Sequence, residues 1–199
     1  NVTSKRLGGS AMALNKTWYA MFSHTGKEIE AVSERLGRKP DAIYTNNLEY
    51  DGALLSKVWF GRHDGILENS VGVLRPNSVL TLHGYNRILP KWYVEYLEAH
   101  NIKCYNLHPA PIQLYRDLKG KDPQERLFEG IHEGRYLYIG NVIHEVIPEV
   151  DSGEILAWDL MPVNSGSAVC RSVDSLSKSL HSVATVLWAE FLKEALSDG

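Results

Sequence analysis

Residues 17–45 read TWYAMFSHTGKEIEAVSERLGRKPDAIYT, and this stretch decides the fold. Its first six residues form a short apolar and aromatic run, which is the pattern of a buried strand. Apolar residues then recur at helical spacing from Ile29 to Leu36, and Gly37 ends that helix because glycine tolerates a left-handed cap. Residues 42–45 form a second strand candidate. A strand, a helix and a strand within about 30 residues predict a βαβ unit, and therefore a parallel sheet.

The rest of the chain extends this sheet. Further strands are expected at residues 57–60, 78–82 and 102–106, and helices at residues 65–73, 90–99 and 125–133. Two extended segments, residues 135–147 and 153–162, predict a long antiparallel pair. Apolar residues recur at alternating spacings of four and three from Val169 to Phe191, which predicts a helix packed on the core. The expected fold class is α/β, with a Rossmann-type parallel sheet, an antiparallel C-terminal extension and a long C-terminal helix.

Composition narrows the class of protein. The 199 residues suit one domain, and 44% hydrophobic with 23% charged residues is ordinary for a globular chain. A net charge of −3 argues against a nucleic-acid partner bound through a broad basic surface. No apolar run approaches the roughly 20 residues of a membrane span, so no membrane partner is expected.

Two further features concern location and domain limits. Cys104 and Cys170 have no metal-like or redox spacing and are too few to staple a domain of this size, so a reducing, cytoplasmic compartment is expected. The Gly8–Ser10 triplet is typical of a linker. We therefore predict a flexible extension or tag remnant over residues 1–15 and a single catalytic domain over residues 16–199.

Three predicted strands end in polar turns. These turns are Ser23–Gly26, His83–Arg87 and Asn106–Pro109. The carboxyl ends of parallel strands lie at one edge of a sheet, which is where open α/β sheets bind ligands. We therefore expect an active site at this edge.

Four segments carry a resemblance to a known family. They are Gly84–Pro90, Asn106–Pro109, Gly140–His144 and Pro148–Gly153. Each is weak alone, but their order and spacing resemble the signature of the glycinamide ribonucleotide formyltransferases, within the wider folate-dependent formyltransferase family. The resemblance spans roughly residues 17 to 195, and it implies a formyltransferase-like fold.

The resemblance implies transfer of a formyl group from 10-formyltetrahydrofolate to a primary amine. Asn106 and His108 can donate to the oxyanion that develops, and losing one such donor costs about a hundred- to thousand-fold in rate. Asp151 can orient His108 and help to move the proton from the amine. No metal is expected. Each of the three residues also fits a structural role, so the case depends on the set.

The resemblance also assigns binding residues. Those expected around the folate are Arg87, Ile88, Leu89, Val150, Asp151 and Ser152. Those expected around the acceptor, which the family holds by a phosphate on the first glycine turn, are Gly26, Lys27, Glu28 and His144. The pterin is placed between the two folate-binding loops, with Ile88 and Leu89 as apolar walls.

The acceptor half of the pattern departs from the family. Lys27 and Glu28 replace a usual Ser-Asn, and a carboxylate opposes a phosphate unless its side chain turns away. Leu180 stands where the family has an acidic residue before a histidine, Val142 replaces a small hydroxyl residue, and residues 114–120 replace a shorter turn. The chemistry is therefore better defined than the acceptor.

Several functions stay open at this stage. The first is formylation of glycinamide ribonucleotide in purine biosynthesis, and the second is formylation of another amine, such as an amino sugar nucleotide. A formyltetrahydrofolate hydrolase, in which water replaces the amine, is a third. A folate-binding protein without activity belongs to a different class. The oligomeric state and the polyglutamate preference are not predicted.

Overall fold

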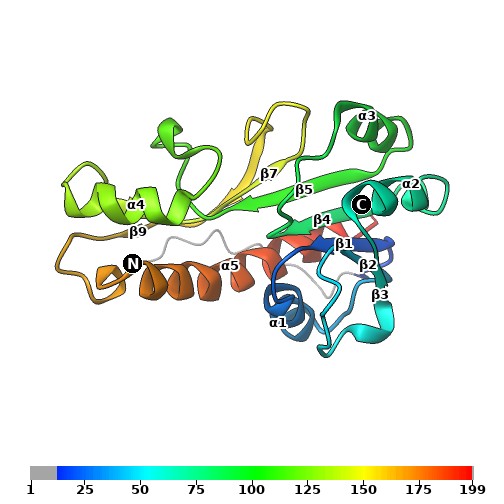
Figure 1. The fold of residues 1–199 in the computed structure, drawn as a ribbon, viewed down its shortest axis with the longest axis horizontal. Helices are drawn as coiled ribbons and strands as arrows, with labels where there is room; N and C mark the ends of the chain where they lie inside the picture. Colours follow the sequence, from blue (N-terminus) through cyan, green and yellow to red (C-terminus); the bar gives the residue numbers. More distant parts are fainter. Residues whose placement is uncertain (1–12, 199) are drawn as a thin grey trace.

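A computed structural model of the chain describes residues 13–198 (Figure 1). The expected N-terminal extension, residues 1–15, lies mostly outside these residues. The strands are β1 Trp18–Phe22, β2 Ala42–Thr45, β3 Val58–Phe60, β4 Val79–His83, β5 Lys103–His108, β6 Tyr138–Ile139, β7 Val142–Glu145, β8 Ile155–Trp158 and β9 Met161–Pro162. The α-helices are α1 Lys27–Leu36, α2 His63–Ser70, α3 Lys91–Ala99, α4 Pro123–His132 and α5 Val173–Ala195.

The main sheet has the order β3-β2-β1-β4-β5-β7-β8. Its first five strands are parallel, whereas β7 runs antiparallel to β5 and β8 antiparallel to β7. The predicted α/β class, with a parallel sheet and an antiparallel extension, is confirmed.

The antiparallel extension is more broken than the sequence predicted. Only β7 and β8 join the main sheet, while β6 and β9 form a separate two-stranded sheet. The break falls at Gly140, where a Cβ atom would lie 2.1 Å from the carbonyl oxygen of Asp159. The two backbones therefore approach too closely at this point for a regular ladder. The predicted antiparallel pair forms, but it is interrupted at Gly140.

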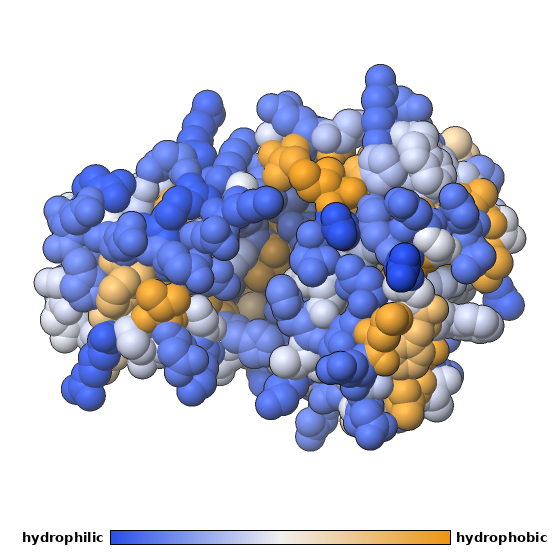
Figure 2. All heavy atoms as spheres, in the orientation of Figure 1, coloured by the Kyte–Doolittle hydropathy of each residue, from blue (hydrophilic) through white to orange (hydrophobic). Residues whose placement is uncertain are grey.

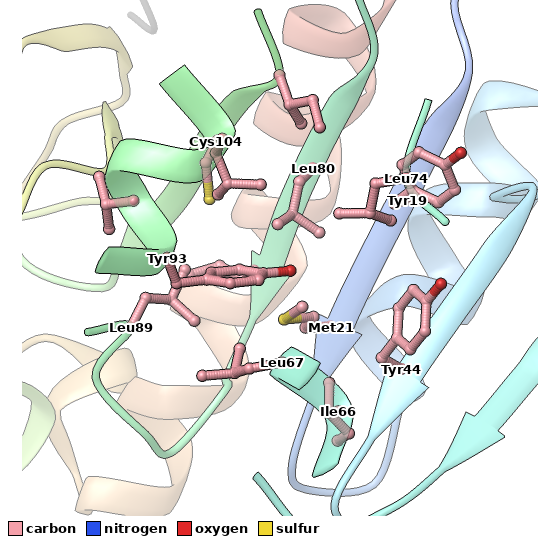
Figure 3. Close-up of a cluster of buried hydrophobic side chains, with 14 residues drawn as sticks. Tyr19, Met21, Tyr44, Ile66, Leu67, Leu74, Leu80, Leu89, Tyr93 and Cys104 are labelled. Carbon is pink, nitrogen blue, oxygen red and sulfur yellow. The ribbon is translucent and has the colours of Figure 1, made fainter. Parts of the chain in front are cut away.

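Helices cover both faces of the sheet (Figure 1). On one face α2 and α3 pack on a cluster of apolar side chains, and Figure 3 shows Tyr93 of α3 between Leu67 and Leu80, with Leu89 beside it. On the other face α1 and α5 enclose a second cluster that includes Trp18, which is fully buried. A third cluster joins α4 to α5 beyond the end of the parallel strands.

The buried face of the long helix α5 agrees with the predicted stripe at Leu176 and Leu180 and departs from it further along. The buried positions after Leu176 are Leu180, Ala184, Trp188, Ala189 and Leu192, and all but Ala189 follow a spacing of four residues. Because an α-helix has 3.6 residues per turn, residues spaced by four do not lie directly above one another. The buried face of α5 therefore rotates slowly along the helix, from the third cluster to the second. Val183, a predicted core position, is 41% exposed.

Two smaller features bear on the other expectations. Among residues 13–198, no helix combines the length and the apolar character needed to cross a bilayer. Cys104 and Cys170 are both buried and unpaired.

Candidate active site

The carboxyl ends of β1, β4 and β5 lie at one edge of the sheet, as predicted. The register pairs Phe22 with His83, and Leu82 with Asn106. The turns after these strands are also bonded to one another, because the Ser23 hydroxyl donates to Asn86 Oδ1 at 2.9 Å and accepts from the Asn86 N–H at 2.8 Å. The edge is therefore a connected structure that can hold side chains in fixed positions.

Asn106 and His108 lie within β5, not in the turn after it. The predicted strand ended at residue 106, but pairing with β7 extends it, since Asn106 faces His144 and His108 faces Val142. Residues two apart on a strand point to the same face. Because one residue separates them, the side chains of Asn106 and His108 lie on the same side of the sheet.

Asp151 lies between two histidines. Its Oδ2 is 3.3 Å from His108 Nδ1, and its Oδ1 is 3.3 Å from His144 Nε2. All three side chains are at most 9% exposed. Asp151 has a φ of 51°, in the left-handed region, which directs its carboxylate back toward β5 and β7. The predicted pair of His108 and Asp151 is thus brought together, and His144 joins it.

The outer nitrogen of each imidazole is fixed by a backbone carbonyl. His108 Nε2 donates to the Leu118 carbonyl at 2.7 Å, and His144 Nδ1 donates to the Glu145 carbonyl at 3.0 Å. Because a carbonyl oxygen only accepts, these two nitrogens must carry hydrogen. The nitrogens that gain or lose a proton are therefore His108 Nδ1 and His144 Nε2, and both face Asp151.

The Asp151 carboxylate is held in its ionised form. Burial is the largest single influence on its pKa and raises it, but hydrogen bonds from His108 and His144, with a bond from the Gly120 N–H at 2.8 Å, together outweigh burial. The net effect holds the pKa of Asp151 well below its ordinary value. At neutral pH the carboxylate therefore stays ionised, and it can stabilise a proton that His108 or His144 carries toward it.

Asn106 is the side chain of the set that can still donate to a ligand. Its Nδ2 lies 3.3 Å from His144 Nε2, so it donates to that nitrogen only while the nitrogen carries no proton. Once His144 Nε2 is protonated and bonded to Asp151, the Asn106 N–H is released. Both His108 nitrogens are engaged within the protein, although the sequence suggested that this ring also donates to an oxyanion.

The residues expected around the folate fall into exposed and buried groups. Ile88 is 66% exposed and Val150 is 44% exposed, while Arg87 is also exposed. Leu89 is buried in the core beside Tyr93 and is not a free wall of a binding site. Figure 2 shows apolar atoms at the surface between the β7–β8 loop and α3, on a face that is hollowed near its centre.

A cavity of about 500 Å³ opens beside Asp151. It lies between the segment after β5 and the β7–β8 loop, and its lining residues are Ile112, Gln113, Arg116, Lys119, Glu149, Asp151, Ser152, Gly153 and Ile155. The Lys119 ammonium also donates to Ser152 Oγ at 3.4 Å. A small ligand in this cavity could reach the carboxylate.

Glu28, expected near the acceptor, is turned into a partly buried cluster, in which its own side chain is 18% exposed and that of His181 is 44% exposed. Its Oε1 lies 3.0 Å from His83 Nδ1 and accepts from the Trp188 indole N–H at 2.9 Å, and its Oε2 lies 3.5 Å from His181 Nδ1. Burial raises the pKa of Glu28, but hydrogen bonds from His181 and His83 lower it to about 2. The bond to Glu28 in turn raises the pKa of His181.

No sequence pattern pointed to this cluster. Its members come from β4, α1 and α5, and Trp188 is 160 positions away from Glu28. His83 was visible only as part of a polar turn. By contrast, Lys27 is exposed, and Gly26 is buried with a φ of 73°.

The segment after β5 also contributes to the site, which was not predicted. The Leu118 carbonyl and the Gly120 N–H bond to His108 and Asp151 respectively. These are backbone groups, so the identity of the side chains carries little signal for them. The only hint was that residues 114–120 depart from the family pattern.

Comparison with solved structures first gives the class of protein to which the fold corresponds. No family model matches the chain. The crystal structure of phosphoribosylglycinamide formyltransferase from Anaplasma phagocytophilum aligns with a TM-score of 0.73 and 21% identity, over 90% of this chain and 86% of that one. A formyltetrahydrofolate deformylase from Pseudomonas syringae aligns with a TM-score of 0.68 and 18% identity, over 92% of this chain and 61% of that one. The fold is therefore that of the folate-dependent formyltransferases.

A comparison of sequences then gives a particular enzyme that the chain resembles. Phosphoribosylglycinamide formyltransferase from Dictyostelium discoideum is 32% identical over 88 residues, which are 43% of this chain and 41% of that protein. The aligned part of the chain spans less than half the length of the curated relatives that it matches. The resemblance indicated by the motifs is confirmed, and it is a resemblance to formyltransferase enzymes of this kind.

Proposed function

We propose that this protein is an enzyme that transfers a formyl group from 10-formyltetrahydrofolate to a primary amine. The observation that carries the proposal is the ionised, buried Asp151 between His108 and His144, with the Asn106 amide beside them. Acyl transfer to an amine needs a group that takes a proton and a donor that stabilises an oxyanion. This set contains both.

Each residue has a defined part in this chemistry. When bound, the folate supplies the formyl group whose carbon the amine nitrogen attacks, and the bond between that carbon and the folate nitrogen then breaks. The Asn106 N–H donates to the oxygen where negative charge develops. Asp151 and His108 accept the proton that the amine loses and return it to the departing folate nitrogen. His144 stabilises the Asp151 carboxylate from its other side.

The proposed folate site is supported by the character of two loops. Ile88 and Val150 leave apolar side chains exposed on either side of the edge, and Ile147 adds a third that is 38% exposed. Burying such side chains against an aromatic ring system is favourable by about 25 cal/mol per Å² of apolar surface. Arg87 is exposed and could bond an acidic part of the folate.

Glycinamide ribonucleotide is the acceptor that we propose first. Gly26 precedes α1 and has no side chain to cap it, although the Lys27 N–H donates to Thr25 Oγ1 at 3.3 Å. The remaining N–H groups at this helix N-terminus favour a phosphate. The Glu28 carboxylate, which would oppose a phosphate, is turned into the cluster with His83 and His181. A bound phosphate requires the Glu28 side chain to turn away from it. The bonds of this side chain to His83 and His181 support this part of the proposal.

A second candidate is the formylation of another amine. It is favoured by Leu180, which is 3% exposed and part of the core. The family has an acidic residue at this position, and a buried leucine cannot bond an acceptor. An acceptor that needs no such contact, such as an amino sugar nucleotide, fits this feature better.

A spectrophotometric assay of folate deformylation tests the proposal. We expect 10-formyltetrahydrofolate, or its dideaza analogue, to be deformylated when glycinamide ribonucleotide is present and not when it is absent. Turnover with other amines alone would favour the second candidate, and turnover without any amine would identify a hydrolase. His108→Ala should abolish turnover while folate affinity is kept. If the unaltered protein binds folate but shows no turnover with any amine, it is a folate-binding protein and not an enzyme. If it does not bind folate, the proposal is overturned.

A further inference from the structure

The Arg126 side chain donates hydrogen bonds to several backbone carbonyls of residues 117–121, the segment before α4. Its guanidinium donates to the Lys119 carbonyl at 2.8 Å, to the Lys121 carbonyl at 2.7 Å and to the Leu118 carbonyl at 3.3 Å. It also donates to the carbonyl of Asp117. Four carbonyls of one short segment thus converge on a single cation.

The same segment supplies the contacts that orient the proposed catalytic pair. The Leu118 carbonyl accepts from His108 Nε2 at 2.7 Å, and the Gly120 N–H donates to Asp151 Oδ2 at 2.8 Å. The Leu118 side chain is fully buried in the cluster between α4 and α5. One segment therefore fixes the outer nitrogen of the histidine and one oxygen of the carboxylate.

This geometry depends on a cation with several donors. Carbonyl dipoles that point toward one place repel one another, and the segment has no ladder of its own that would satisfy them. It also includes a left-handed residue, Gly120, with a φ of 89°. The planar guanidinium offers five N–H donors in a fixed fork, which a lysine ammonium cannot reproduce.

We propose that Arg126 is a positioning residue for the formyl transfer, acting through the segment 117–121. By holding this segment, it keeps the Leu118 carbonyl on His108 Nε2 and so leaves His108 Nδ1 to exchange the proton with Asp151. Among the described residues, Arg126 forms no hydrogen bond or ion pair with His108 or Asp151, and its bonds go to the carbonyls of the segment. The expected effect on kcat rests on the proposed function. The expected effect on the bond between the Leu118 carbonyl and His108 does not.

The kinetic test compares Arg126→Ala with a matched control, Arg38→Ala. Arg38 also binds backbone carbonyls, those of Leu14 at 2.9 Å and Lys16 at 2.7 Å, but in the N-terminal segment. We expect Arg126→Ala to lower kcat by about 100-fold with little change in KM, since a displacement of about 1 Å in a catalytic group costs that much. Guanidinium ion at tens of millimolar should restore part of the loss. Arg38→Ala should leave kcat unchanged.

Two outcomes would overturn the inference: an unchanged kcat in Arg126→Ala, or a loss that guanidinium does not restore. If Arg126→Ala fails to fold, Arg126→Lys takes its place, because it keeps the charge and removes the fork. We expect Arg126→Lys to lower kcat by about tenfold, again with little change in KM. A kcat equal to that of the unaltered protein would contradict the role.

A spectroscopic test separates this inference from the proposed function. With ¹⁵N-labelled histidine, the Nε2 proton of His108 should give a signal protected from exchange with water, and Arg126→Ala should remove that protection. Arg38→Ala should keep it. If the unaltered protein proves inactive, the proposed function fails, but this signal still decides the role of Arg126. An unaltered signal in Arg126→Ala would contradict it.

Discussion

Asp151 is constrained in two independent ways. Its backbone is left-handed, and its carboxylate faces two imidazoles whose outer nitrogens are occupied by carbonyls. Asparagine tolerates the left-handed region at least as well as aspartate, so it can replace Asp151 without added backbone strain. The substitution therefore removes the charge and keeps the shape.

We predict that Asp151→Asn lowers kcat by about 10² to 10⁴-fold, the range that a proton-transferring group contributes. The protein should still fold, which circular dichroism and a thermal melt can check. The control is Asp122→Asn, since Asp122 also has a left-handed φ, of 52°, but is exposed. Equal activity of the Asp151 variant and the unaltered protein would remove Asp151 from the mechanism.

Glu28 gives a prediction on stability and pH. Its folded pKa of about 2 lies below its ordinary value of 4.5, so its contribution is present in full above pH 4.5 and is lost as the pH falls toward 2. A shift of this size corresponds to on the order of 3 kcal/mol. His181, whose pKa is raised, contributes below pH 6.5 and loses its contribution as the pH rises through the raised value.

Glu28→Gln should therefore be less stable than the unaltered protein by the largest margin between about pH 4.5 and pH 6.5. The margin should shrink on both sides of this window, and urea unfolding at a series of pH values measures it. In the same variant the pKa of His181 should fall, which proton NMR can follow. If the difference in unfolding free energy between the two proteins does not change with pH, the charges of Glu28 and His181 do not contribute to stability as proposed.

At the scale of elements, the start of α1 depends on the absence of a side chain at Gly26. A Cβ atom there would lie 2.7 Å from Tyr50 Cε2, and the φ of 73° is already unfavourable for other residues. Gly37, at the other end of α1, has a φ of 72°, but a Cβ atom at that position would meet no atom within 4 Å. The two glycines share a left-handed φ, and the space around their missing Cβ atoms differs.

Gly37→Ala should cost about 1–2 kcal/mol, which is the strain of a left-handed residue. Gly26→Ala should cost more, because Tyr50 or the turn must also move. Urea unfolding of both variants measures the difference, which isolates the steric part. Equal costs would mean that the crowding at Gly26 relaxes freely.

Elements were predicted well where a local pattern decides them. The βαβ unit of residues 17–45 follows from an apolar run, a helical spacing and a capping glycine, and all three agree with β1, α1 and β2. Prediction failed where tertiary contacts decide. Pairing with β7 carries β5 to His108, and close approach at Gly140 splits the antiparallel pair.

At the scale of the whole molecule, the site combines predicted and unpredicted parts. The motifs predicted Asn106, His108 and Asp151 as candidate site residues, and the fold brings their side chains together. The cluster of Glu28 with His83, His181 and Trp188 depends on how α5 crosses the sheet, which no short spacing encodes. The backbone contacts of Leu118 and Gly120 depend on loop geometry, which side chains predict poorly.

The fate of the formyl carbon tests the central claim most directly. The protein would be incubated with a folate donor labelled with ¹³C at the formyl group, together with glycinamide ribonucleotide, and the products followed by carbon NMR. The account predicts that the label moves to the amine as a formamide in the unaltered protein and stays on the folate in Asp151→Asn. Label released as formate whether or not the amine is present, or label that never leaves the folate, would contradict the account.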